Sequence, residues 1–151
     1  MTGRSDDLLV DAIDWLENDA AVQEALGDGG AIYPIQLAQG AYEDDPVNDA
    51  DPRIFVAASV LDSSRDDLWA PTTLRLRFIV DGTRALVEAE GMKALITLKS
   101  DVIETLTRQR AGYDTDGVAS DAEIAWSEGI GRYLGAVELI YNRQKIHQSH
   151  G

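Results

Sequence analysis

From Leu74 to Val80, apolar side chains recur at every second position, and this repeat is the feature that most constrains the fold. In an extended strand, one face would carry Leu74, Leu76, Phe78 and Val80. Arg75 and Arg77 would lie on the other face. A strand with one apolar face must be covered by another layer of secondary structure. The segment therefore predicts a sheet with a second layer packed on one side of it.

A helical repeat follows this strand almost at once. Thr83 ends a short turn and is a candidate N-cap. Apolar residues then recur at helical spacing over residues 84–109, which would form a helix roughly 39 Å long. Gly91 weakens its centre by up to ~1 kcal/mol, and Ser100 offers an alternative start for a second helix. We favour one helix, because the apolar repeat stays in phase across residues 99–101.

The N-terminal region predicts two short helices. Apolar residues repeat at helical spacing from Leu8 to Leu16, after a candidate N-cap at Ser5. Asp19 is placed to cap a second, shorter helix, and Gly27 would end it.

The remaining segments predict strands separated by polar loops. Pro34 cannot donate a backbone hydrogen bond, so the extended segment 32–37 is expected at a sheet edge. Other expected strands are residues 53–61, 122–127 and 134–142, the last two as a hairpin, and the expected loops are residues 40–52, 62–71 and 111–120. The predicted class is α+β: a mostly antiparallel sheet with one long helix and a short N-terminal helix packed on it, in the order α-β-β-β-α-β-β. We expect a single domain over residues 1–151, with flexible ends at 1–7 and 143–151.

The chain is strongly acidic. It has 27 Asp and Glu residues against 13 Lys and Arg residues, which gives a formal net charge of −14. Lysine is scarce, at Lys93, Lys99 and Lys145 alone. Acid-rich, lysine-poor composition resembles proteins of extreme halophiles, and an ordinary acidic cytosolic protein is the alternative. Such a surface repels nucleic acid, so we expect no direct affinity for DNA.

Several classes of protein are disfavoured by what the sequence lacks. The absence of cysteine excludes disulfides, thiolate metal sites and cysteine nucleophiles. No run approaches the roughly 20 apolar residues of a membrane span, and the polar residues 1–7 do not predict a signal peptide. The histidines, His147 and His150, lie in a polar tail, where a metal pair is conceivable but a disordered terminus is the simpler interpretation. A Ser-His-Asp triad therefore has no base in the body of the chain.

Nucleotide and metal motifs are also missing. The glycines of residues 27–30 are not followed by the Gly-Lys-Ser/Thr of a phosphate loop, and Gly129 and Gly131 precede a predicted strand instead of a helix. One acidic cluster comprises Glu43, Asp44, Asp45, Asp49 and Asp51, and a weaker one comprises Asp114, Asp116 and Asp121. Calcium binding by the first cluster is the alternative to a solvated acidic loop, but the EF-hand spacing is absent. We expect no enzyme activity, no cofactor and no metal.

Four side chains are candidates for contacts between subunits. Arg75 and Arg77 lie on the strand face away from the core, where they would either extend over the sheet and pair with local acids or meet the acidic surface of a neighbouring subunit. Trp69 and Tyr42 lie in the two long loops, as interface anchors or as side chains that close the edge of the core.

Three short segments carry a resemblance to a known family. Residues 25–28 read Ala-Leu-Gly-Asp, residues 32–34 read Ile-Tyr-Pro, and residues 132–137 read Arg-Tyr-Leu-Gly-Ala-Val at the start of the last strand. In their order over residues 8–142, they resemble the tail-completion, or tail-terminator, proteins of long-tailed, siphovirus-like phages and related archaeal viruses.

The resemblance implies a structural role in a virion. Members of this family form a homohexameric ring on the last ring of the tail tube protein, stop tube growth and present a surface to the head–tail connector or neck protein. DNA passes through the lumen without specific binding. Together with the acidic composition, the resemblance implies a tailed virus of a haloarchaeon, with the protein made in the host cytoplasm and located in the virion.

Two other hypotheses stay open. A different neck component, such as a head-completion or stopper protein, would differ in fold, and its long helix would not lie against a sheet of this order. A small halophilic cytoplasmic enzyme or ligand-binding domain would need a concave pocket with convergent polar groups, for example one lined by Tyr113, Asp114 and Trp126.

Overall fold

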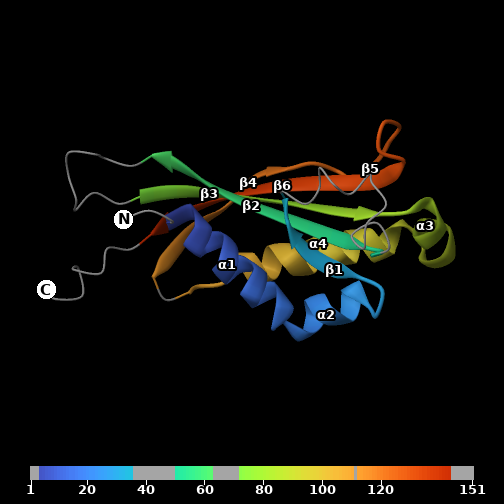
Figure 1. Ribbon diagram of the computed structural model, residues 1–151, viewed down its shortest axis with the longest axis horizontal. Helices are drawn as coiled ribbons and strands as arrows, with labels where there is room; N and C mark the ends of the chain where they lie inside the picture. Colours follow the sequence, from blue (N-terminus) through green and yellow to red (C-terminus); the bar gives the residue numbers. More distant parts are fainter. Residues whose placement is uncertain (1–3, 36–49, 63–71, 111, 144–151) are drawn as a thin grey trace, which may run out of the picture.

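The computed structural model describes residues 4–35, 50–62, 72–110 and 112–143, which form a sheet with helices packed against one of its faces (Figure 1). In chain order the elements are α1 (Arg4–Glu17), α2 (Ala20–Leu26), β1 (Ala31–Pro34), β2 (Arg53–Asp62), β3 (Thr72–Gly82), α3 (Arg84–Glu90), α4 (Met92–Leu106), β4 (Tyr113–Asp121), β5 (Ala125–Ser127) and β6 (Arg132–Arg143). The first helix includes residues 4–7, which the sequence had assigned to a flexible end.

The sheet is antiparallel except at one edge. Its strand order is β1-β2-β3-β6-β4, and β5 also pairs with β6 beyond the end of β4. β1 runs parallel to β2. These pairings confirm the predicted α+β class and the mostly antiparallel sheet. They also place β1, which ends at Pro34, at an edge, where a missing backbone donor breaks no ladder.

The core lies between the sheet and the helices α1, α2 and α4. Alternation along β3 buries the four apolar residues that the sequence singled out, Leu74, Leu76, Phe78 and Val80. Helix α1 buries Leu8, Ala12 and Leu16, which are four residues apart and therefore share one face. Asp19 caps α2 as predicted, because its carboxylate accepts a hydrogen bond from Val22 N at 3.1 Å.

The long helix predicted over residues 84–109 is instead two helices. Gly91 separates α3 from α4 and adopts φ 84° and ψ 163°, a conformation essentially restricted to glycine. Its backbone N donates to Val87 O at 2.7 Å and its carbonyl accepts from Ala94 N at 3.2 Å, so this residue closes α3 and opens α4. Residues 99–101, across which the apolar repeat stays in phase, lie inside α4, which packs on the core through Leu95, Leu98 and Val102, whereas α3 buries no residue fully. No helix in the described ranges is long and apolar enough to cross a membrane.

The predicted loop over residues 111–120 is also wrong, because most of it forms strand β4. Tyr113 starts this strand with its ring buried against Trp15, at 5.6 Å between ring centroids, and its hydroxyl donates to Asp11 Oδ2 at 2.9 Å. The rest of β4 is half-buried or exposed and is irregular, with two register shifts against β6 and a positive φ at Gly117. A polar, glycine-containing sequence is tolerated here because β4 is an edge strand. The predicted hairpin of β5 and β6 is present, although β5 is only three residues long.

Candidate assembly surface

Within the described residues, the sheet has one face covered by helices and a second face that is not. The sequence predicts the interface candidates Arg75 and Arg77 on this second face. The helices that pack on the sheet lie on the opposite face (Figure 1). We call this second face the open face and define it by Ala57, Ser59, Arg75, Arg77, Ile79, Ala136, Glu138 and Ile140, which alternate with core residues along β2, β3 and β6. These side chains range from half-buried to exposed.

Arg75 and Arg77 point away from the core, as the alternation predicted. Arg77 is exposed and stands between Ala57 on β2 and Glu138 on β6, whereas Arg75 is half-buried. Within the described part of the chain, neither guanidinium forms a hydrogen bond or ion pair. Glu138 is the one carboxylate among these eight residues, which include two arginines, so this part of the sheet has an excess of positive charge on a chain of net charge −14.

Several predicted site residues lie outside the described residues. They are the interface candidates Tyr42 and Trp69, the loop acids Glu43, Asp44, Asp45 and Asp49, and the tail histidines His147 and His150.

An aromatic cluster lies at one end of the same face. The rings of Tyr33 and Phe55 are 5.8 Å apart, and Phe55 is buried next to Ile35 and Ile79. The Arg53 guanidinium stacks over the Phe55 ring at 5.0 Å. This end of the sheet is therefore more enclosed than the part that carries Arg75 and Arg77.

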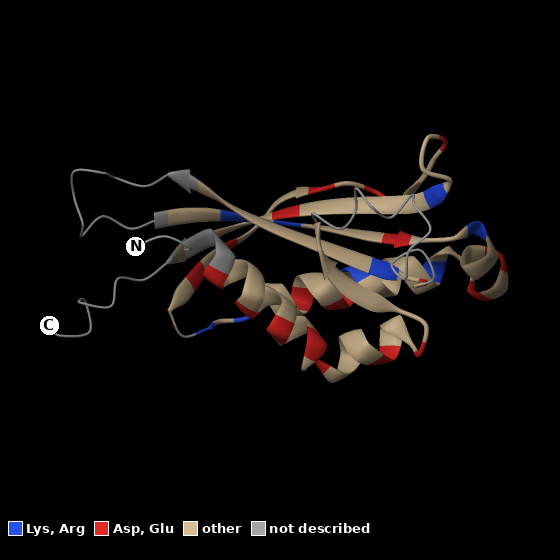
Figure 2. Ribbon diagram, in the orientation of Figure 1, with Lys and Arg blue, Asp and Glu red and all other residues tan. Residues whose placement is uncertain are grey.

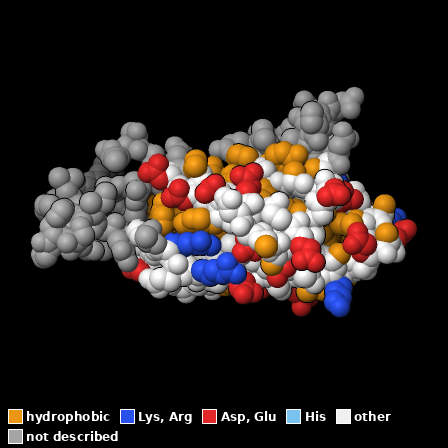
Figure 3. Space-filling view, turned by 90° about the horizontal axis from the view of Figure 1, so that it is seen from below, with side chains coloured by type: hydrophobic (Ala, Val, Ile, Leu, Met, Phe, Trp, Pro, Cys, Tyr) orange, Lys and Arg blue, Asp and Glu red, His pale blue; other side chains and the backbone are white. Residues whose placement is uncertain are grey.

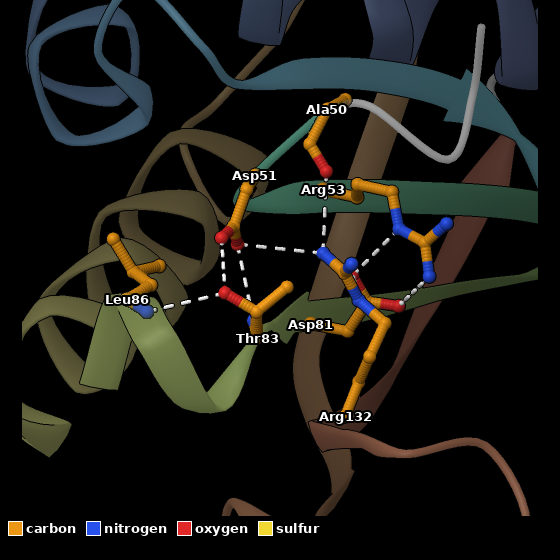
Figure 4. A network of polar contacts seen from close by, with 7 residues as sticks. All are labelled: Ala50, Asp51, Arg53, Asp81, Thr83, Leu86 and Arg132. Atoms are coloured by element: carbon orange, nitrogen blue, oxygen red, sulfur yellow. Dashed lines mark hydrogen bonds and ion pairs between the residues drawn. The ribbon is translucent and has the colours of Figure 1, made fainter. Parts of the chain in front are cut away.

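A buried polar network adjoins the aromatic cluster (Figure 4). Arg53 binds Asp81 through two hydrogen bonds, Nε to Oδ1 at 2.9 Å and Nη2 to Oδ2 at 2.7 Å. Arg132 Nε donates to Asp81 Oδ1 at 3.2 Å. Burial lowers the pKa of the Arg132 guanidinium, and the Asp81 carboxylate opposes that shift. One carboxylate thus joins the beginnings of β2 and β6 to the end of β3.

Asp51 extends this network to the start of α3. Arg132 Nη2 donates to Ala50 O at 3.2 Å and approaches Asp51 Oδ1 at 3.4 Å. Thr83 donates to Asp51 from its backbone N at 3.1 Å and from its hydroxyl, while that hydroxyl accepts from Leu86 N at 3.1 Å. Thr83 is therefore the helix N-cap that the sequence predicted, held in place by a carboxylate (Figure 4).

Sequence patterns did not predict this network. Asp51 belongs to the acidic cluster for which calcium binding was the alternative, whereas the structure shows its carboxylate bonded to Thr83 and Arg132. One sequence feature could have indicated the network. Asp81 lies on the same face of β3 as Arg75 and Arg77, so it places an acidic side chain at the end of a row of basic ones. Among the residues described, no group of three or more acids or histidines is arranged to hold a metal ion. All three acids of the second cluster have partners: Asp114 accepts from Gln109 at 3.4 Å, Asp116 accepts from Asn142, and Asp121 pairs with Lys99.

The pocket imagined for a ligand-binding domain does not form. Tyr113 pairs with Arg143 at the end of β6, and Trp126 pairs with Tyr133 near its beginning, so the two lie roughly 33 Å apart along the strand. The Trp126 ring instead lies under the Arg84 guanidinium, with Cζ 4.5 Å from the ring centroid, and next to the Tyr133 ring, at 5.0 Å between ring centroids. A hollow of about 190 Å³ exists elsewhere, between α2 and the α3–α4 junction, and its lining includes Glu24, Leu26, Asp28, Asp51, Leu86 and Glu90.

Comparison with known proteins identifies solved structures that have the same fold. No model of a known protein family matches the chain, and no curated protein matches its sequence. A chain in the solved structure of the virion of a native gene transfer agent particle matches 87% of this chain and 89% of its own length, with a TM-score of 0.54 and 16% identity. A second solved structure matches 95% of this chain and 98% of its own length, with a TM-score of 0.54 and 14% identity. This protein shares its fold with both.

Proposed function

We propose that this protein is a structural component of a phage-like virion. The observation that carries the proposal is the fold shared with a chain of the gene transfer agent virion over nearly the whole of both chains. The sequence segments that resemble tail-terminator proteins support it. They occupy the end of α2, strand β1 and the start of β6.

The specific role we propose is that of a tail terminator. The protein would cap the tail tube as a homohexameric ring and join the tail to the connector or neck protein, without enzymatic activity. A lumen lined by a chain of net charge −14 would let DNA pass without gripping it. The halophile-like composition favours a tailed virus of a haloarchaeon as the source.

A closed ring needs two different, complementary patches on each subunit. The open face supplies one candidate patch through Arg75 and Arg77, and Trp69 and Tyr42 remain candidate anchors. The apolar side chains around the arginines matter as well, because salt screens ion pairs and leaves apolar contacts intact.

Deleting the gene from its virus and imaging the particles by electron microscopy tests the role. A terminator predicts tails of uncontrolled length or heads without joined tails, and restoration by the gene supplied in trans. Normal virions in the deletion strain would refute it. Light scattering coupled to size exclusion in molar salt tests the ring, which has an expected mass near six times the 16.4 kDa chain.

A further inference from the structure

The outer side of α1 carries an acidic row with an exposed valine in it. Asp7, Val10, Asp14 and Glu17 recur at spacings of three, four and three residues, so they share one side of the helix, and all four are exposed. Val10 is 65% exposed, more than the other large hydrophobic side chains of the described residues. Figure 2 shows acidic segments repeating along α1 and α2, and Figure 3 shows acidic side chains spread among apolar ones on this side of the molecule.

The open face carries a row of matching chemistry. Arg75, Arg77 and Ile79 follow one another at alternate positions of β3 and span roughly 13 Å. Along α1, Glu17, Asp14 and Val10 span roughly 10 Å of helix axis. Over these three positions, both rows read charged, charged, apolar in one direction, and their charges are opposite. The long arginine side chains can absorb the small difference in length.

We propose that the outer row of α1 docks on the β3 row of a second copy of this chain. Asp14 and Glu17 of one subunit meet Arg77 and Arg75 of the next, and Val10 packs against Ile79. The inference rests on the proposed ring and names the surface that faces the arginines. A guanidinium binds a carboxylate through two parallel hydrogen bonds, which fixes the register of the contact as well as its charge.

A second copy is the partner that the charges favour. The two arginines and one carboxylate among the eight residues of the open face are complemented by an acidic surface, and every copy of this acidic chain presents one on α1. The two rows belong to opposite layers of the subunit, the helices and the far face of the sheet. The contact is therefore heterologous, which is the kind that builds rings.

Two charge-reversed chains test the docking. The first carries Arg75→Glu and Arg77→Glu, so both of its rows are acidic. The second carries Asp14→Arg and Glu17→Arg, so both of its rows are basic. Each chain alone brings like charges together and is expected to lose the assembled species. An equimolar mixture restores opposite charges at every contact, and a ring of six accommodates strict alternation.

The readout is particle mass by light scattering, at the lowest salt in which the wild-type protein stays folded by circular dichroism. A matched control for the second chain, Glu88→Arg with Glu123→Arg, makes the same charge change at exposed positions outside the row and should assemble like the wild type. If either reversed chain assembles alone as the wild type does, the docking is refuted while the ring stands. If the wild-type chain forms no ring, in solution or on isolated tail tubes, the proposed ring fails and the docking fails with it.

Discussion

Arg53 and Asp81 form a two-point ion pair between β2 and β3, and their side chains are only 2% and 3% exposed. Arg132 shares the same carboxylate at 3.2 Å. Removing charges from water is costly, so such a group is stable only when each member keeps its partners. The carboxylate of Asp81 is the member on which both guanidiniums depend.

Asp81→Asn should therefore destabilise the fold strongly. It leaves two buried guanidiniums without their shared anion, and breaking a buried pair in this way costs roughly 3–5 kcal/mol. The matched control is Asp121→Asn, which removes the same charge from the partly exposed pair with Lys99 and should cost less than about 1 kcal/mol. Chemical denaturation at one fixed salt concentration measures both. An equal loss in the free energy of unfolding for the two variants would mean that the buried network stabilises the fold no more than the partly exposed ion pair does.

Gly91→Ala should destabilise the junction of α3 and α4. An alanine at φ 84° and ψ 163° lies in a region that costs about 1–3 kcal/mol for a residue with a side chain, although no neighbouring atom would crowd its Cβ. Gly129→Ala is the control, because Gly129 has no positive φ and open space around it. Thermal melts should show a lower Tm for the first variant alone. A higher Tm for Gly91→Ala would indicate that the two helices readily merge into one.

This junction illustrates what the sequence could and could not predict. The helical repeat correctly placed helices over residues 84–106, but a single glycine costs too little in a helix for its presence alone to predict a break. Strand β4 was missed for a related reason. Its polar sequence forms a strand through pairing with β6 and the burial of Tyr113, and neither is visible in local propensity.

The candidate surface also contains features that the sequence could predict and features that it could not. Alternation with period two was enough to orient Arg75 and Arg77, because strand geometry alone fixes the face. The network around Asp81 was not predictable locally, since Arg53 and Arg132 lie 28 and 51 residues from it in the chain. Only the order of strands brings them together.

Asp101→Asn should stabilise the protein at neutral pH. Burial, and then the carboxylates of Glu104, Asp19 and Glu24, raise the pKa of Asp101 above its ordinary value of 3.8. The folded state thus disfavours the charged form, and the charge is destabilising at every pH above the raised pKa. The like-charged neighbour Glu104, three residues on, alone accounts for about 0.2–0.5 kcal/mol.

The gain in the free energy of unfolding from Asp101→Asn should shrink as the pH falls through the raised pKa towards 3.8. At those pH values the wild-type Asp101 carboxyl becomes protonated and is then as neutral as the amide. Denaturation curves from pH 7 down to the acid limit of folding measure this trend. Glu128→Gln, at an exposed carboxylate, is the comparison variant. A gain that stays constant with pH would show that the amide acts through hydrogen bonding and not through charge.

Salt should raise the stability of this chain. With a net charge of −14, the folded state brings many carboxylates close together, and their repulsion is screened as the Debye length falls from about 10 Å at 0.1 M salt to about 3 Å at 1 M. The Tm should therefore rise with KCl over this range. Substituting Glu88, Glu123 and Glu128 by Gln removes three exposed negative charges and should reduce the slope of Tm against salt. Substituting the exposed neutral residues Thr97, Ser100 and Ser120 by Ala should leave that slope unchanged. If both triple variants keep the wild-type slope, salt acts through the general strengthening of apolar burial, and the acidic surface is not its target.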